Sequence, residues 1–548
     1  MPRYDLITER WVPVVEAGRR SDVSLIELFE HANDISGLAL DDPLQMVAIL
    51  RQVVLPVWWE ATGFPRSETE WAVRWASVTS RNKAVHQYLA MYADRFDLFH
   101  SVRPFAQAAG LQYVRGGSQP VSRLIPNVAT GNNVPLYGGC TEADAPPLSA
   151  AEAARAVLTI QCWDPAVPIG RAVGDTLGTT PLVYNQLAPT GKLGVIIPTG
   201  RNLAETLVLN TPILKQGVWA GDMPQWRHAQ PADASWQQRP AKGVLDLLTW
   251  QPRRICLIPS ESVHGHLQVT EIIITAGDKL DQIPIDVEVH TAWRVKSKPT
   301  PGQRPEYPAT HEPGRSAWRG LSSLVATGQV NNNVRTCPLI EQLASVSLRA
   351  GMPTDYPLQV VEVGAVYGAK SAIIMDTFVD TTPVPVAALP PGSAAQVLLI
   401  EVVTQIEDMR RAADWLRSNI QQAAGRSVNQ TRQDSHLDDG LGEHLVFALE
   451  PIVRRLITDL QTAAVPANIL RQGWQDQAFR TARLVADAVI ETAPPAAFLG
   501  RTFLDSHKKE RTIRLSSAAN YYYSQLRDIL GFQPATLPKS TTITTGAA

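Results

Sequence analysis

Cysteine, net charge and long apolar runs are all scarce in this sequence. The four cysteines, Cys140, Cys162, Cys256 and Cys337, are far apart and form no C-x-x-C pair. This spacing predicts neither a disulfide framework nor a zinc ribbon, as is typical of a reducing compartment. No apolar run approaches the roughly 20 residues that a membrane helix requires, and residues 1–5 lack a signal-peptide pattern. We therefore expect a cytoplasmic protein without membrane contact.

The overall charge is nearly balanced. The formal net charge is −2 at pH 7 and the sequence pI is about 6.6. A free-standing, non-specific nucleic-acid binder is usually basic overall, so this balance argues against that class. It excludes neither local basic patches nor a subunit that shares its contacts with other chains.

One long stretch lacks acidic residues altogether. Leu98–Cys140 contains no Asp or Glu, although the chain holds 52 of them, and it carries His100, Arg103, Arg115 and Arg123. Its second half is rich in Gly, Asn and Pro, which predicts a long loop. Backbone N–H groups and guanidinium forks both suit phosphate, so the pattern indicates a polyanion. An ordinary solvated surface loop is the open alternative.

Motifs for catalysis are also missing. The sequence has no P-loop, no G-x-G-x-x-G after a strand, no G-x-S-x-G and no H-E-x-x-H. The best metal-like cluster is Asp434, His436 and Asp438, whose residue types could ligate a divalent ion. It precedes a predicted helix, where Asp is also favoured as a cap. We expect no catalytic site, metal or cofactor; a metal-dependent hydrolase or nuclease using this cluster is the alternative.

Local patterns predict a mixed first part of the chain. They indicate a strand pair within Leu6–Val15, a helix capped by Asp42, and a further helix over residues 68–96. Strands are expected at Arg254–Ile258, Glu271–Thr275 and Ile285–Val289. The clearest hairpin spans Leu358–Phe378, with Gly368 supplying the turn conformation and Lys370 at the tip.

Leu389-Pro390-Pro391-Gly392-Ser393 breaks this pattern, and nothing beyond it has the pattern of a strand. Four helices are expected, at residues 394–424, 439–463 (with a kink or break at Pro451), 466–492 and 508–530. The fold class is thus α+β. Residues 1–390 form a large mixed domain with long functional loops and a hairpin, residues 391–533 form a four-helix bundle, and residues 534–548 form a disordered tail.

Several segments in one order resemble a known family. They are Asp5–Val14, with its Trp11-Val12-Pro13; Phe96–Gln107, with His100 and Pro104-Phe105-x-Gln107; Gly138–Thr141; and Trp250-Gln251-Pro252. Together they resemble the CasA large subunit of type I-E CRISPR surveillance complexes (Cascade), and the helical C-terminal quarter also fits.

The resemblance implies a non-catalytic subunit that recognises a protospacer-adjacent motif in duplex DNA and helps open the duplex for R-loop formation. It also implies four kinds of partner, which are the 5′ handle of a CRISPR guide RNA, double-stranded target DNA, other Cascade subunits and a recruited helicase–nuclease. Some relatives carry a cysteine-rich zinc site after Trp-Gln-Pro. Here Cys256 stands alone, so we predict no zinc.

Site residues follow from the resemblance position by position. Ile125, Pro126 and Asn127 fall on the family loop that docks onto the RNA handle, and the asparagine matches. Val167, Pro168, Ile169 and Gly170 fall on a glycine-rich loop near the minor groove, of which only Gly170 is retained. Arg171 could substitute a side-chain contact, and Lys279 is the best counterpart of a minor-groove lysine. The family's duplex wedge, an Asn-Gln pair, falls on Gly368 and Ala369, so neither side chain is kept. Either the adjacent Lys370 takes over this role or the hairpin backbone alone forms the wedge.

A third hypothesis is a scaffold that binds only proteins. It predicts no dependence on motif sequence and no salt-sensitive DNA binding.

Overall fold

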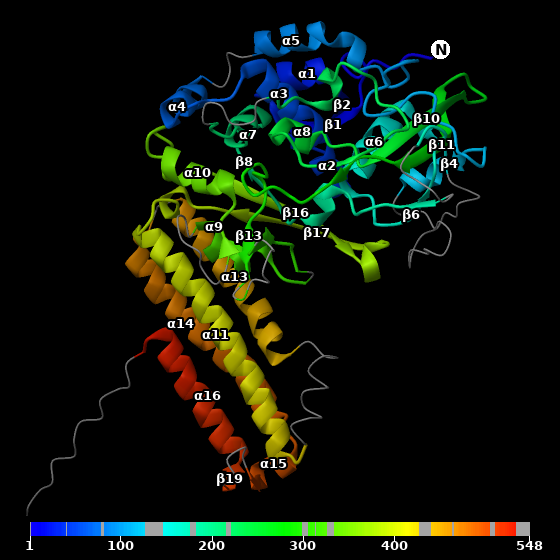
Figure 1. Ribbon diagram of the computed structural model, residues 1–548. Coiled ribbons are helices and arrows are strands. Elements are labelled where there is room, and N and C mark those ends of the chain that lie inside the picture. The colour runs from blue at the N-terminus through cyan, green and yellow to red at the C-terminus, as the bar shows by residue number, and fades with distance from the viewer. Residues whose placement is uncertain are drawn as a thin grey trace, which may run out of the picture. The chain divides into compact units, whose positions relative to one another are not determined.

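The computed structural model shows a mixed helix-and-sheet protein (Figure 1). It divides into two compact units, residues 1–391 (unit 1) and 392–548 (unit 2). The residues described are 2–39, 41–77, 82–125, 146–175, 182–214, 221–296, 298, 305–312, 314–325, 334–426, 440–462, 465–504 and 510–532. No helix in these ranges is long and apolar enough to cross a membrane.

The first sheet begins later than the sequence indicates. Its strands are β1 (Val12–Glu16), β2 (Arg19–Val23) and β3 (Ile35–Leu38), in the order β2-β1-β3. The strand pair expected within Leu6–Val15 is therefore wrong. Only the end of that range is strand, and the buried indole of Trp11 donates to the Leu6 carbonyl at 2.8 Å.

The helix capped by Asp42 is present, but its middle is widened. Asp42 accepts from the Leu44 amide and Pro43 occupies the first turn of α2 (Pro43–Ile49). A π-helical turn over Leu50–Val54 joins α2 to α3 (Leu55–Thr62). The wider turn comes just before Pro56, which has no amide proton to donate.

The single helix expected at residues 68–96 is wrong. The structure has α4 (Glu68–Ala76), α5 (Asn82–Met91) and a 3₁₀ turn at Ala93–Arg95. Ser77 ends α4, and the residues after it, Val78-Thr79-Ser80, have low helix propensity.

One long antiparallel pair is β10 (Arg253–Glu261) with β11 (Leu267–Ala276). It contains two of the predicted strands, and β4 (Gln119–Pro120) and β5 (Leu148–Ser149) add to β11. The strand predicted at Ile285–Val289 is wrong. The Pro284 carbonyl accepts the amides of Val287 and Glu288, which makes a turn there.

The predicted hairpin forms as β16 (Gln359–Tyr367) and β17 (Ile374–Pro383). It belongs to a sheet of order β17-β16-β8, where β8 is Val195–Thr199. β8 pairs only with residues 359–363 of β16. Beyond Val363 the hairpin is therefore a two-stranded ribbon.

Shorter elements complete unit 1. The helices are α1 (Leu25–Glu30), α6 (Ala150–Trp163), α7 (Leu203–Leu209), α8 (Val244–Leu248), α9 (Leu321–Val325) and α10 (Pro338–Val346). The strands are β6 (Pro168–Gly170), β7 (Leu182–Tyr184), β9 (Gln238–Arg239), β12 (Lys279–Leu280), β13 (Trp293–Val295), β14 (Glu306–Pro308) and β15 (Val334–Arg335).

Unit 2 consists mainly of long helices. They are α11 (Ala394–Ala423), α13 (Leu441–Gln461), α14 (Ala467–Glu491) and α16 (Leu515–Leu530). The helix α11 contacts the other three. The break expected at Pro451 is wrong: α13 continues through this exposed proline, whose ring lies on the solvent side of the helix.

Two further expectations for unit 2 are wrong. A small hairpin, β18 (Arg501–Leu504) with β19 (Glu510–Ile513), follows the short helix α15 (Pro495–Leu499). The last helix therefore starts at Leu515 rather than near residue 508. Thr502 pairs with Thr512 across the hairpin, a β-branched pair typical of strands.

A buried ion pair ties the π-helical turn to the turn after Pro284. Arg51 donates to both carboxylate oxygens of Glu288, at 2.9 and 2.7 Å. Their side chains are 2% and 1% exposed. Removing one partner of such a pair leaves an uncompensated charge in the core, whereas replacing both by apolar residues is often tolerated.

Arg51→Met should therefore lower the free energy of unfolding by about 3–5 kcal/mol, because it strands the Glu288 carboxylate. The double variant Arg51→Met/Glu288→Leu should recover most of that loss. Urea denaturation of the full chain measures both. A double variant as unstable as the single one would contradict this account of the pair.

Candidate functional site

The carboxylate of Asp164 joins three parts of unit 1. It follows α6, which opens with a capping box of Ser149 and Glu152. Its oxygens receive Arg123, at 2.9 Å, and the Nε of Arg253. Asp164 and Arg253 have 0% side-chain exposure. Burial alone would raise the pKa of Asp164, but the two guanidinium groups outweigh burial and hold that pKa below its usual value.

Arg253 also fixes the backbone that follows Asp164. Its guanidinium donates to the carbonyl of Pro165 at 2.8 Å and to that of Gln186 at 3.1 Å. The Asn185 amide donates to the Val167 carbonyl at 3.3 Å. Asp164, Pro165 and Val167 are thus held by contacts with Arg253 and Asn185, up to the first of the predicted motif-reading residues.

The segment Val167–Arg171 forms the start of a small hairpin. Its strand β6 pairs with β7, with Ile169 opposite Val183. Pro168 is exposed and Ile169 is buried. This alternation leaves Pro168 on the outer face and uses Ile169 for packing.

Gly170 is required by its neighbour Tyr113. A Cβ at Gly170 would lie 2.7 Å from the Tyr113 ring. That ring cannot easily move, because its hydroxyl donates to the Ile274 carbonyl and accepts from the Ile274 amide, both at 3.0 Å. The retained glycine therefore serves internal packing, whatever else approaches its backbone.

The Arg171 side chain folds back onto its own loop. It donates to the Asp175 carbonyl at 2.7 Å, and its Nε lies 3.8 Å from the Asp175 carboxylate. Its side chain is 25% exposed. In this conformation the guanidinium is engaged within the protein, which limits the side-chain contact that the sequence suggests for Arg171.

Lys279 lies close to the same loop. Its ammonium is 4.4 Å from the centroid of the Trp236 ring. Burial lowers the pKa of Lys279, and the nearby Asp175 carboxylate opposes that shift. The structure thus brings Lys279 near the 171–175 segment, although 108 residues separate Lys279 from Arg171 in the sequence.

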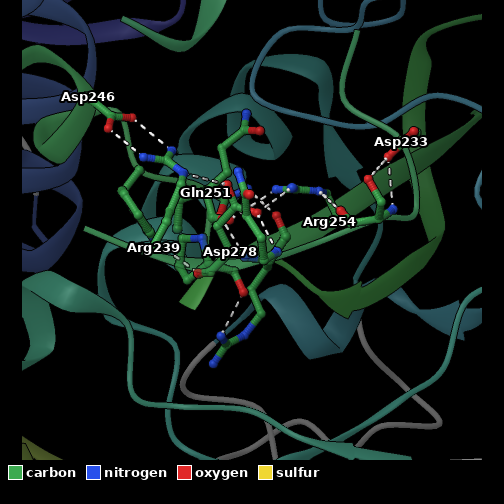
Figure 2. Close-up of polar contacts among 12 residues, drawn as sticks. Asp233, Arg239, Asp246, Gln251, Arg254 and Asp278 are labelled. Atoms are coloured by element: carbon green, nitrogen blue, oxygen red, sulfur yellow. Dashed lines mark hydrogen bonds and ion pairs between the residues drawn. The ribbon is translucent and has the colours of Figure 1, made fainter. Parts of the chain in front are cut away.

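A polar cavity of about 280 Å³ lies beside Lys279 and is lined in part by Asp278. Figure 2 shows how its charges are matched: Arg239 binds Asp246 and Asp278, and Arg254 also binds Asp278. The Arg239 guanidinium in addition stacks 4.0 Å from the Trp250 ring. Because Arg239 and Arg254 are both paired with carboxylates, neither offers free positive charge to the cavity.

The hairpin tip, residues 368–371, has a different backbone from the one predicted. Gly368 is extended, and the left-handed residues are Lys370 (φ 56°) and Ser371 (φ 54°). The prediction that Gly368 supplies the turn conformation is therefore wrong. Its small size matters instead, since a Cβ there would meet Ile373 at 3.1 Å.

Lys370 extends from this tip into solvent. Lys370 and Ala369 are both exposed. Its ammonium makes no ion pair or hydrogen bond with any residue in the described ranges. Two consecutive left-handed residues other than glycine cost roughly 1–2 kcal/mol each. Strain of this kind persists where surrounding contacts impose it.

Two contacts join the hairpin around its tip to the end of α6 and to the residues just after it. The Tyr367 hydroxyl donates to the Trp163 carbonyl at 2.7 Å. The Ala166 amide donates to the Ser371 carbonyl at 2.8 Å. The structure therefore brings the predicted wedge residues beside the predicted motif-reading segment.

A buried carboxyl lies nearer the base of the hairpin. Glu362 of β16 is 3.2 Å from His311, and both side chains are nearly inaccessible. Burial and then the neighbouring Asp380 raise the pKa of Glu362 to about 8, while burial lowers the pKa of His311 to about 4. Both shifts favour the neutral forms of the carboxyl and the imidazole over an ion pair at the hairpin base.

The predicted docking residues are only partly described. Ile125 ends the 3₁₀ turn Val121–Leu124 and follows closely on Arg123, the partner of Asp164. Pro126 and Asn127 lie outside the described residues, as do Asp434, His436 and Asp438. Within the described ranges, no three His, Cys, Asp or Glu side chains gather in a way that could hold a metal ion.

Sequence reasoning missed Asp164, Tyr367 and Ser371. Asp164 did leave a signal: an acidic residue at a helix C-terminus opposes the helix dipole, so it needs a cationic partner. Tyr367 and Ser371 left none, because their partners Trp163 and Ala166 lie about 200 residues away in the chain.

Comparisons with known proteins agree with this architecture. The family model of CRISPR-associated protein Cse1 matches residues 5–485. A CasA/Cse1 protein of Thermus thermophilus is 28% identical over 364 residues, which cover 61% of this chain and 69% of that protein. The crystal structure of Thermobifida fusca Cse1 has a TM-score of 0.82 at 28% identity, covering 97% of this chain and 98% of that one.

A chain from a solved CRISPR RNA-guided surveillance complex shares the fold, with a TM-score of 0.69 at 19% identity over 96% of this chain and 100% of that one. The family model spans well over half of the sequence. The chain therefore belongs to the family of CRISPR-associated Cse1, or CasA, proteins.

Proposed function

We propose that this protein is the large, non-catalytic subunit of a type I-E CRISPR RNA-guided surveillance complex. In that complex it recognises a protospacer-adjacent motif in double-stranded DNA and helps open the duplex for R-loop formation. It docks onto the 5′ handle of the guide RNA and onto other subunits, and it helps recruit the helicase–nuclease. Family membership and the likeness to a chain of a solved surveillance complex support this proposal.

The observation that carries the proposal is the meeting of two predicted elements. The exposed, left-handed tip with Lys370 is hydrogen-bonded to Ala166, directly before the Val167–Arg171 segment. A protein that reads a motif and separates the next base pair needs these two elements side by side. Nothing in the local sequence links them, so their proximity is independent support.

The chemistry suits the minor groove. That groove carries a degenerate pattern of donors and acceptors, so a few donors and a close backbone suffice to read it. Pro168 and the backbone near Gly170 form the motif-contacting face. Lys279 is the cation that reaches the groove, and its stacking on Trp236 fixes its direction. Arg171 contributes by holding the loop through Asp175.

Opening needs little energy at the first step. Separating one base-pair step costs roughly 1.4 kcal/mol of stacking on average. The attraction between one ammonium group on a rigid tip and the DNA phosphates is of the right magnitude to offset that stacking cost. Gly368 and Ala369 keep the tip narrow, and Lys370 supplies its charge.

Lys370→Ala should slow target opening by up to about tenfold, since tenfold corresponds to about 1.4 kcal/mol, while complex assembly is retained. A tip shortened at Gly368-Ala369 should have at least the same effect. R-loop formation on matched duplexes measures both. Lys83→Ala, at an exposed helix position, is the control. Normal R-loop formation in both tip variants would refute the wedge assignment.

Gly170→Ala should disturb motif reading, because the new methyl group forces the anchored Tyr113 ring to move. Overpacking of this kind costs about 1–3 kcal/mol. Binding of the assembled complex should then discriminate less among duplexes that differ in the three bases beside the target, measured at two salt concentrations.

Gly473→Ala in α14 is the matched control, since nothing lies within 4 Å of its Cβ position. Unaltered discrimination in Gly170→Ala, despite a lowered melting temperature, would remove the 167–171 segment from motif reading. Salt-sensitive binding without any motif preference in the native complex would indicate a general DNA clamp, and no dependence on this subunit would indicate a scaffold.

Asn127→Ala should weaken incorporation of the subunit into the complex, because an asparagine amide can both donate to and accept from RNA. The measurement is the fraction of subunit that co-purifies with guide RNA and the other subunits. Asn520→Ala, at an exposed position of α16, is the control. Full retention of the Asn127 variant would argue against the docking role.

A further inference from the structure

We propose that Tyr367 is a positioning residue that locks the hairpin tip to the segment preceding Val167, so that motif contact and duplex opening are performed by one rigid piece of the protein. This inference rests on the proposed function and specifies how its two elements act together. Neither the tip nor the motif-reading segment contains Tyr367, so its effect is exerted through them.

The first link is the Tyr367 hydroxyl. It donates to the carbonyl of Trp163, the last residue of α6. The final carbonyls of a helix have no partner within the helix, so this one is available. Gly191 makes room for the hydroxyl, since a Cβ there would lie 2.4 Å from the tyrosine oxygen. The Trp163 carbonyl and the absence of a side chain at Gly191 therefore both favour this position of the Tyr367 hydroxyl.

The second link is between backbones, from the Ala166 amide to the Ser371 carbonyl. It holds the strained pair Lys370 and Ser371 in its left-handed conformation. The two links bracket the tip, one at the end of β16 and one just before β17. A tip held at only one of these two points could rotate about that point.

The anchor itself is rigid. Residues 163–166 lie between the end of α6 and the 167–171 segment, and the inaccessible Arg253 binds both Asp164 and the Pro165 carbonyl. Movement of the tip must therefore move the start of the motif-reading segment, or break one of the two links. Contact with the correct motif can in this way set the position of the tip.

The link is insensitive to pH. Burial raises the pKa of Tyr367 well above its usual value, and the Asp164 carboxylate raises it further. The hydroxyl therefore remains a donor through the whole range in which DNA is double-stranded.

Tyr367→Phe removes one oxygen and leaves the ring in place. Hydrogen exchange of the full chain should become several-fold faster at the amides of Ala166 and Gly368–Ala372. The matched control is Tyr522→Phe in unit 2, whose buried hydroxyl likewise donates to a backbone carbonyl, that of Ala482. Unchanged exchange around Ala166 would overturn the proposed lock without reference to DNA.

Two DNA measurements on the assembled complex separate positioning from a general structural role. The first is the affinity ratio between duplexes with good and poor motifs. The second is the rate at which 2-aminopurine in the first target base pair becomes fluorescent. In Tyr367→Phe the ratio should stay within about twofold of the native value, while opening slows roughly five- to tenfold, as expected for losing one buried hydrogen bond.

The outcomes are distinguishable. Native opening in Tyr367→Phe, with a slowed Lys370→Ala variant, overturns the lock and leaves the proposed function intact. An equal loss of motif discrimination and opening in Tyr367→Phe also overturns it, because it indicates general disruption. A native complex that shows neither discrimination nor motif-dependent opening overturns the proposed function and this inference with it.

Discussion

Asp164 lies at the end of α6 without solvent exposure, and its carboxylate is paired with the guanidinium groups of Arg123 and Arg253. Arg253 comes from the first strand of the pair β10–β11, and Arg123 comes from the 3₁₀ turn Val121–Leu124, within the acid-free stretch. One carboxylate thus ties together the end of a helix, the start of a strand and a 3₁₀ turn. Such a charge is costly to bury, so this arrangement is stable only while both arginines remain in place.

The secondary structure that the sequence predicted well is the part governed by local pattern. The runs at residues 254–258, 271–275 and 360–363 are β-branched and do form strands. Ile285–Val289 has a similar composition but forms a turn that follows Pro284, and its Glu288 pairs with Arg51. Nothing near residue 288 in the sequence indicates that partner, which lies 237 positions away.

The candidate site shows the same limit. Position by position, the resemblance selected Gly170 and Lys370, and the structure brings their segments together. It could not indicate that Arg171 is engaged by Asp175, or that the turn strain falls on Lys370 and Ser371 rather than on Gly368. These properties depend on backbone angles and on partners distant in sequence. The residues that join the two segments, Trp163, Ala166 and Tyr367, carry no motif at all.

The short reach of β8 along β16 has a mechanical consequence. Past Val363 the ribbon is a beam that leaves its sheet, and a beam held at one end deflects most at its free end. The contacts at Trp163 and Ala166 support its far end as well. If the tip acts on DNA as proposed, force from a resisting base pair would be shared between the sheet and α6 instead of bending the ribbon. The stiffness of these two supports would then limit the work that the tip can do on the DNA.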